Sequence, residues 1–269
     1  MPGAPRMSPG RPNTNMPSAA LRNPIRLALM PGFDLLTRRR VFLARYWRSG
    51  PRRVLDAGVG NGWFAYLAYR SGAAVLAIGN EEGQVAKARA FYNGWMGIPE
   101  DRLRFQLTDL RALDTLEGRF DEILCYETLE HILDDRRVCT QFRRLLADEG
   151  DLHICVPNAA HPRWAQEPLD ERGEWGGHVR AGYTHATLDS LLQPLGFERT
   201  ATAGVGGSAL ALADQWLQRM RGSVGDLGAV PVALPLLSLV SLDSDQPKVP
   251  YSVYGRFRKA ACAPASSLP

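Results

Sequence analysis

The sequence lacks the features that mark a secreted or membrane-spanning protein. It has four cysteines in 269 residues and no CxxC pair. Two of them, Cys125 and Cys155, stand in apolar runs, so we expect buried reduced thiols and a cytoplasmic protein. The nearest candidate span, 229–242, falls short of the ~18–20 residues of a bilayer-spanning helix and is broken by two prolines. The first residues lack the apolar centre of a signal peptide. From these two observations the sequence predicts neither a transmembrane segment nor a signal peptide.

The sequence also contains little lysine. The net charge is +4, yet only three of the 32 basic residues are lysine. An arginine excess of this kind is typical of GC-rich coding, and no lysine-rich patch accompanies it, so we expect no nucleic-acid partner. The hydrophobic fraction of 45% and the charged fraction of 22% are ordinary for a globular protein.

Between its ends the chain alternates apolar runs with helical patterns. Pro, Gly and Asn are dense at 1–24, and both this segment and 260–269 are predicted to be disordered tails around one domain, 25–259. The strand patterns lie at 52–57, 73–78, 103–109, 119–127, 151–158 and 251–259. The helical patterns lie at 25–49, 62–72, 81–97, 136–150 and 185–196. Continuous apolar strands separated by helices predict a mostly parallel sheet covered on both faces, with an insertion at 205–248 before the last strand.

The stretch "VLDAGVGNG" places glycines directly behind the first strand. Gly58, Gly60 and Gly62 form G-x-G-x-G, whereas a dinucleotide loop needs G-x-G-x-x-G, and Trp63 is too large for the third glycine's role. The carboxylate of Asp56 would also repel a diphosphate. It would attract a cationic ligand such as S-adenosylmethionine, which carries an ammonium and a sulfonium.

Residues 52–157 resemble the class I S-adenosylmethionine-dependent methyltransferase family. The matching pieces are "VLDAGVGNG", "FDEILCYETLEHILDD" and "GDLHICVPN". The resemblance implies an α/β fold with a single Rossmann-like, seven-stranded, mostly parallel sheet whose last strand is antiparallel. It implies S-adenosylmethionine as cofactor and S-adenosylhomocysteine as product. The cofactor contacts it implies are Asp56, Gly58, Gly60, Gly62, Asp109, Leu110, Tyr126 and Glu127.

The chain departs from the family pattern after the second strand. The family places Asp or Glu there to bind the ribose, and this chain has Gly79. Glu81, Glu82 or Gln84 could take over this contact, as a glutamine does in the cyclopropane-synthase-like branch. Alternatively, the two glutamates only complement the positive end of a helix, which we favour for Glu82.

Methyl transfer needs a base only when the acceptor must lose a proton. His178 and His131 are the candidate bases, with a structural role left open for His131. No histidine shows metal-ligand spacing, so we expect no required metal. Residues that could contact the acceptor are His161, Trp164, Trp175, Tyr183 and Trp216. For Trp164, Trp175 and Tyr183 the alternative is that they merely pack a long loop onto the sheet.

The insertion bears on the acceptor. Leu210, Ala213, Leu217 and Met220 share a helical face. Three uses stay open: a lid over a hydrophobic substrate, contact with a membrane surface, or a homodimer contact. The layout is similar to quinone-precursor O-methylating enzymes, so O-methylation of a small hydrophobic or aromatic metabolite is our first hypothesis. C- or N-methylation, a catalytically silent member of the fold, and an NAD-dependent oxidoreductase are the alternatives.

Overall fold

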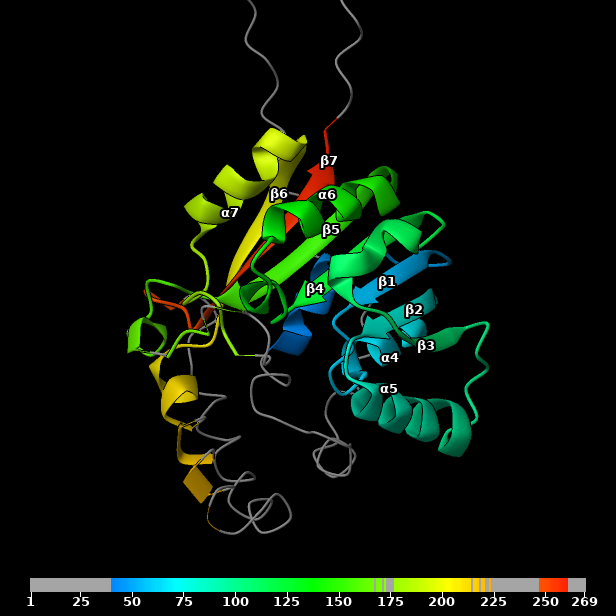
Figure 1. Ribbon diagram of the computed structural model, residues 1–269, viewed down its shortest axis with the longest axis horizontal. Coiled ribbons are helices and arrows are strands. Elements are labelled where there is room, and N and C mark those ends of the chain that lie inside the picture. Colours follow the sequence, from blue (N-terminus) through cyan, green and yellow to red (C-terminus); the bar gives the residue numbers. More distant parts are fainter. Residues whose placement is uncertain are drawn as a thin grey trace, which may run out of the picture.

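Seven strands form one sheet in the order β3-β2-β1-β4-β5-β7-β6 (Figure 1). The computed structural model describes residues 40–166, 168–170, 172, 177–213, 215–217, 219–220, 223 and 247–260. The strands are β1 (Arg53–Ala57), β2 (Ala74–Gly79), β3 (Leu103–Leu107), β4 (Phe120–Tyr126), β5 (Leu146–Pro157), β6 (Phe197–Val205) and β7 (Ser252–Lys259). β1 to β5 pair in parallel, and β7 is antiparallel to both β5 and β6. The predicted fold class is confirmed.

Helices cover both faces of this sheet because buried side chains alternate along the strands. On β1, Val54 packs into one hydrophobic cluster and Leu55 into the other. The helices are α4 (Trp63–Arg70), α5 (Glu82–Arg89), α6 (Asp135–Leu145) and α7 (His185–Leu192). The first cluster includes residues of α4 and α5, and the second includes residues of α6 and α7. Along the described part of the chain, no helix combines the length and the apolar character needed to cross a membrane.

Short helical turns link these elements. The 3-10 turns are η1 (Val41–Tyr46), η3 (Leu110–Thr115), η4 (Leu129–His131), η5 (Trp164–Gln166) and η6 (Gln193–Leu195), and η2 (Ala90–Trp95) is a π-helical turn that continues α5. Of the helix expected over 25–49, the described part is helical over 40–46, with Arg40 α-helical and the rest η1, and it is not helical over 47–49. The rest of that segment lies outside the described residues.

The boundary between α6 and β5 differs from expectation. The helix expected to reach residue 150 ends at Leu145, and β5 begins at once. Leu146 pairs with Phe120, and Asp151 pairs with Glu122 after a shift of register. Glu149 has a left-handed φ of 62°, so the chain between these two pairs bulges without leaving the strand.

Parts of the predicted organisation fall outside the described residues. These are the expected tail at 1–24, all but the first residue of 260–269, and most of the insertion at 205–248. Residues 208–213 and 215–217 of the insertion are helical. Leu210, Ala213 and Leu217 are buried there against Trp164 and Tyr251, which confirms the shared apolar face.

Candidate active site

The loop after β1 is pinned to the end of β2. The backbone amides of Gly58 and Val59 both donate to the carbonyl of Ile78, at 3.0 and 2.8 Å. Gly58 has a φ of 118°, and a Cβ placed on it would lie 2.1 Å from the Thr128 hydroxyl oxygen. Only glycine allows this backbone to lie between β2 and the segment after β4.

The other two glycines of the loop differ in what surrounds them. A Cβ on Gly62 would lie 2.7 Å from Tyr92 and 3.0 Å from Phe105, so helix α4 begins tightly packed on the aromatic core. A Cβ on Gly60 would meet nothing closer than the Gly58 carbonyl oxygen at 4.0 Å. Among the described residues, the backbone of Gly60 therefore faces open space that a ligand could enter.

Asp56 lies beneath this loop. Its side chain is buried, with the residue only 3% exposed. Burial raises the pKa of Asp56 to about 7, although the backbone N–H of Ala65 hydrogen-bonds to the carboxylate and opposes the shift. The carboxylate thus holds the start of α4 and provides an ionisable charge under the glycine loop.

Packing explains why a glycine, Gly79, stands at the end of β2 where the family has an acid. A Cβ there would lie 2.6 Å from Cγ1 of Val59, so the loop occupies the space that an acid at this position would need. Glu81 is the N-cap residue of α5, and Gln84 lies on its first turn. Both are exposed, and the Gln84 amide donates to the Glu81 carboxylate. They lie next to the expected ribose position, and their contact with a ribose stays a prediction.

Asp109 follows β3 and caps η3. Its carboxylate accepts from the backbone N–H of Arg111 at 2.8 Å and pairs with the Arg111 guanidinium at 2.7 Å. Hydrogen bonds and charge from Arg111 hold the pKa of Asp109 below its usual value. The side chain of Leu110 is buried in the core, so only its backbone could meet a ligand. The contacts of Asp109 and Leu110 with the cofactor stay predictions.

Tyr126 and Glu127 end β4 in different ways. Tyr126 is buried, and its hydroxyl accepts from Trp47 Nε1 at 2.9 Å, so its side chain belongs to the core. Glu127 adopts a left-handed φ of 48°, which is strained for a residue with a side chain. Its carboxylate pairs with Arg40 at 2.9 Å. Strain at this edge of the sheet is typical of a functional segment.

The two candidate bases come together. His131 on η4 and His178 after β5 have ring centroids 4.7 Å apart, in an edge-to-face arrangement. Trp164 lies beside them, with its ring centroid 5.4 Å from that of His178. The backbone N–H of His131 donates to the carbonyl of Thr128, the residue against which Gly58 packs. The imidazoles therefore belong to the same edge of the sheet as the glycine loop.

The remaining candidates divide between interior and surface. Tyr183 is buried, and its hydroxyl donates to Asp135 at 2.6 Å, so it packs the loop onto the sheet. His161 is buried against Tyr251, and burial with the charge of Arg163 lowers the pKa of His161. Trp216 is 56% exposed, and Trp175 lies outside the described residues.

Glu130 was missed at the sequence level. It stands directly before His131, and the residue is fully buried. Burial and the negative charge of Glu127 raise the pKa of Glu130 well above its usual value. The only signal in the sequence is an acid next to a candidate base, which does not indicate burial.

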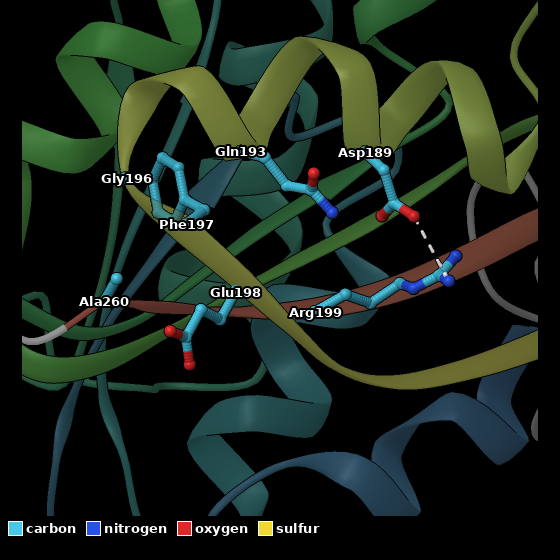
Figure 2. A pocket seen from close by; sticks show the side chains of 7 residues that line it. All are labelled: Asp189, Gln193, Gly196, Phe197, Glu198, Arg199 and Ala260. Atoms are coloured by element: carbon cyan, nitrogen blue, oxygen red, sulfur yellow. Dashed lines mark ion pairs between the residues drawn. The ribbon is translucent and has the colours of Figure 1, made fainter.

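A separate hollow of about 550 Å³ lies at the opposite edge of the sheet (Figure 2). It is lined by residues from the end of α7, the start of β6 and the end of β7: Asp189, Gln193, Gly196, Phe197, Glu198, Arg199 and Ala260. Because β7 is antiparallel to both neighbours, β6 runs with β5 and begins at the amino ends of the parallel strands. None of the expected site residues lines this hollow, so it is not the candidate site.

Comparison with known proteins shows the family to which the chain belongs. A family model described as a methyltransferase domain matches residues 32–202, more than half of the 269 residues. A probable S-adenosylmethionine-dependent methyltransferase of Mycobacterium tuberculosis is 29% identical over 168 residues, which cover 59% of this chain and 57% of that protein. A ubiquinone biosynthesis O-methyltransferase of Escherichia coli is 32% identical over 115 residues, which cover 42% of this chain and 46% of that protein. The chain thus spans about half the length of the curated relatives it matches.

Solved structures share the fold. Phosphoethanolamine N-methyltransferase 2 of Haemonchus contortus, in complex with S-adenosyl-L-methionine, superposes with a TM-score of 0.57 at 15% identity. The match covers 84% of this chain and 53% of that chain. At this identity the likeness concerns the fold alone.

Proposed function

The chain belongs to the class I S-adenosylmethionine-dependent methyltransferase family, and from this premise we propose that it methylates an oxygen of a small hydrophobic or aromatic metabolite. The observation that carries the proposal is one continuous set of contacts. Gly58 packs against Thr128, Thr128 accepts from the His131 amide, and His131 packs against His178. A cofactor loop and two imidazoles are thereby joined at one edge of the sheet.

The loop fits the cofactor on two counts. Open space beside Gly60 allows a ligand to approach the backbone, and the buried carboxylate of Asp56 favours a cation over a phosphate. Asp56 and the three glycines would hold the methionine part, and Glu81, Gln84, Asp109 and Leu110 the nucleoside. When bound, S-adenosylmethionine supplies a methyl group on a sulfonium that is already activated for displacement.

The protein's own task is to orient the acceptor and to accept its proton. As the acceptor oxygen bonds to the methyl carbon, the carbon–sulfur bond breaks and its electron pair stays on sulfur. An imidazole of the His131–His178 pair takes the hydroxyl proton. Holding the reacting atoms in line contributes ~7–11 kcal/mol to lowering the barrier in well-oriented reactions.

Two features favour an apolar acceptor and oxygen chemistry. Trp164 borders the imidazole pair, and the helix packed against it exposes Trp216 and Leu212 by 56% and 59%. Apolar side chains in this position suit a lid over a hydrophobic substrate. The similarity to an O-methyltransferase of ubiquinone biosynthesis supports oxygen as the acceptor atom.

The test is to supply methyl-labelled S-adenosylmethionine with fractionated bacterial metabolites and a panel of phenols. Label is expected in a small organic fraction, with product mass increased by one methyl group. Trp216→Ala should raise KM for that acceptor several-fold and leave kcat nearly unchanged. Trp95→Ala is the matched control, because Trp95 is 77% exposed on η2. Label confined to protein or nucleic acid, or no transfer at all, would refute the proposal.

A further inference from the structure

Three potential metal ligands converge beside the glycine loop. Glu130, His131 and His178 each offer one ligand atom, and these atoms all lie within 4.8 Å of one another. η4 carries the first two, and the segment after β5 carries the third. The backbone N–H of Val179 donates to the Glu130 carbonyl at 2.9 Å, which holds the two segments together. The arrangement thus depends on the fold, since no ligand spacing is visible in the sequence.

The imidazole of His131 is held in the orientation that a metal ligand requires. Its Nδ1 lies 3.1 Å from the carbonyl oxygen of Gly177. A carbonyl oxygen can only accept, so Nδ1 carries a proton, and in the neutral imidazole Nε2 is then the nitrogen whose lone pair can bind a cation. That Nε2 lies 3.8 Å from Oε1 of Glu130. Metal-bound histidines commonly donate their other ring N–H to a backbone carbonyl in this way.

Glu130 is the second, independent observation. Its side chain is 1% exposed, and neither carboxylate oxygen hydrogen-bonds to another described residue. A buried carboxylate without such bonds is unfavourable unless a cation or a proton compensates for it. The charges of Arg40 and Arg180 stabilise the ionised form of Glu130, and its own backbone N–H hydrogen-bonds to the carboxylate, but none of these is a direct bond from another residue.

We infer that Glu130, His131 and His178 bind a divalent transition cation such as Mn²⁺ or Zn²⁺. Two imidazole nitrogens and one carboxylate form a ligand set that such cations prefer to Mg²⁺. Ligands ~2.0–2.2 Å from a cation lie at most about 4.4 Å apart, so small side-chain movements would close the site. Both imidazoles are half-buried, and three protein ligands leave at least one coordination position for water or another ligand.

With both imidazoles on the cation, a remaining coordination position would bind the acceptor oxygen and ease its loss of a proton, which would then pass to solvent and not to an imidazole; this role rests on the proposed function. Cation binding itself does not rest on it. The inference also departs from our expectation of no required metal, because that expectation considered only spacing along the chain.

The experiment uses the untagged full chain, stripped with EDTA and dialysed into chelator-free buffer. Calorimetric titration with MnCl₂ and ZnCl₂, without cofactor or acceptor, should give one cation per chain. Visible absorption of bound Co²⁺ gives a second readout. His178→Ala and Glu130→Gln should each weaken binding by at least about tenfold, since loss of an outer-shell partner alone costs ~10–100-fold. His185→Ala is the matched control, because His185 is the first residue of α7, bonds to the Tyr254 carbonyl and is not one of the three ligands.

The outcomes separate this site from the cofactor loop. S-adenosylmethionine titrated into His178→Ala should bind as it does to wild type. Saturable cation binding lost in both ligand variants but kept in His185→Ala supports the site, even if no methyl transfer is found. No saturable binding, or equal affinity in His178→Ala and wild type, overturns it. Thermal unfolding of each variant checks that a loss of binding is not a loss of fold.

Discussion

At the scale of single residues, the burial of Asp56 affects which ligand the glycine loop can bind. Its pKa of about 7 means that the carboxyl is partly protonated near neutral pH when no cation lies above it. A cationic ligand stabilises the ionised form and lowers this pKa. Cofactor binding should therefore release a proton from Asp56, and affinity should depend on pH.

We expect S-adenosylmethionine to bind more tightly as the pH rises from 6 to 8. The sign follows from the raised pKa: below about 7 the carboxyl is protonated and neutral, and above it the carboxylate attracts the cation. If binding requires the ionised form, this term contributes about tenfold in affinity over the range. Calorimetry at several pH values, in buffers of different ionisation enthalpy, measures both the affinity and the released proton.

Asp56→Asn is the reference for this measurement. The cofactor's own amino group also titrates, and its effect on affinity is the same for wild type and for this variant. The difference in pH dependence between wild type and Asp56→Asn isolates the Asp56 carboxyl. Asp109→Asn is the control, since the pKa of Asp109 is lowered and its carboxylate stays ionised throughout the range. An identical pH profile in wild type and Asp56→Asn would contradict the electrostatic role.

The sequence indicates the residues expected to bind the cofactor more directly than those expected to bind the acceptor. The positions of Asp56 and the loop glycines follow from a short motif, because strand, turn and helix are adjacent in the chain. The meeting of His131 with His178 depends on how a loop after β5 returns to η4. That return is a tertiary event, so the burial of Glu130 between them could not be inferred from its neighbours in sequence.

At the scale of elements, the glycine loop makes two separable demands on its residues. Gly62 is required by packing, because a side chain there would collide with Tyr92 and Phe105. Gly60 has a φ of 46° and open space beside it, so its glycine is required mainly for approach of a ligand.

Gly62→Ala should therefore mainly lower stability, whereas Gly60→Ala should mainly weaken cofactor binding. Gly62→Ala is expected to lower the free energy of unfolding by ~2–4 kcal/mol, from backbone strain plus overpacking. Gly60→Ala should cost only ~1–2 kcal/mol of backbone strain but weaken cofactor binding at least tenfold. Denaturant unfolding and calorimetric titration of both variants measure the two effects. Equal losses of stability in the two variants would show that packing alone explains both glycines.

The elements themselves were predictable where the local pattern was strong. β1 and β4 are apolar runs buried on both faces, β2 is an apolar run that is buried or half-buried throughout, and α6 has a clear apolar stripe. β6 was not identified as a strand, because "FERTATAGV" is largely polar and exposed at the edge of the sheet. Its pairing with β7 is what makes it a strand, and the pairing is not local.

At the scale of the whole molecule, a buried ionic network joins distant parts of the chain. Glu122 on β4 is fully buried and accepts from His153 Nε2 at 3.2 Å, from the Arg48 amide at 2.6 Å and from the Arg52 guanidinium. His153 also bonds to the Tyr254 hydroxyl at 2.8 Å. The segment before β1 is thereby fixed to β4, β5 and β7, so the network stabilises the sheet that positions the site.

Burial alone would raise the pKa of Glu122, but the hydrogen bond and charge of His153, with Arg52 and the Arg48 amide, hold it below its usual value. A depressed pKa means that Glu122 stabilises the fold above the pKa of the unfolded chain. This contribution is lost as the pH falls through the folded-state pKa. Unfolding free energy should therefore decrease in acid, and part of that decrease should belong to Glu122.

Glu122→Gln should lower the free energy of unfolding at pH 7 by ~3–5 kcal/mol, because it leaves Arg52 buried without its opposite charge. It should also flatten the loss of stability below pH 5, since the group that titrates has been removed. Urea unfolding at pH 7 and at several acid pH values measures both effects. Glu117→Gln is the control: Glu117 is an exposed glutamate, and such surface changes stay within ~0.5 kcal/mol. If Glu122→Gln unfolds with the same stability and acid dependence as Glu117→Gln, the network does not fix the segment with Arg48 and Arg52 to the sheet.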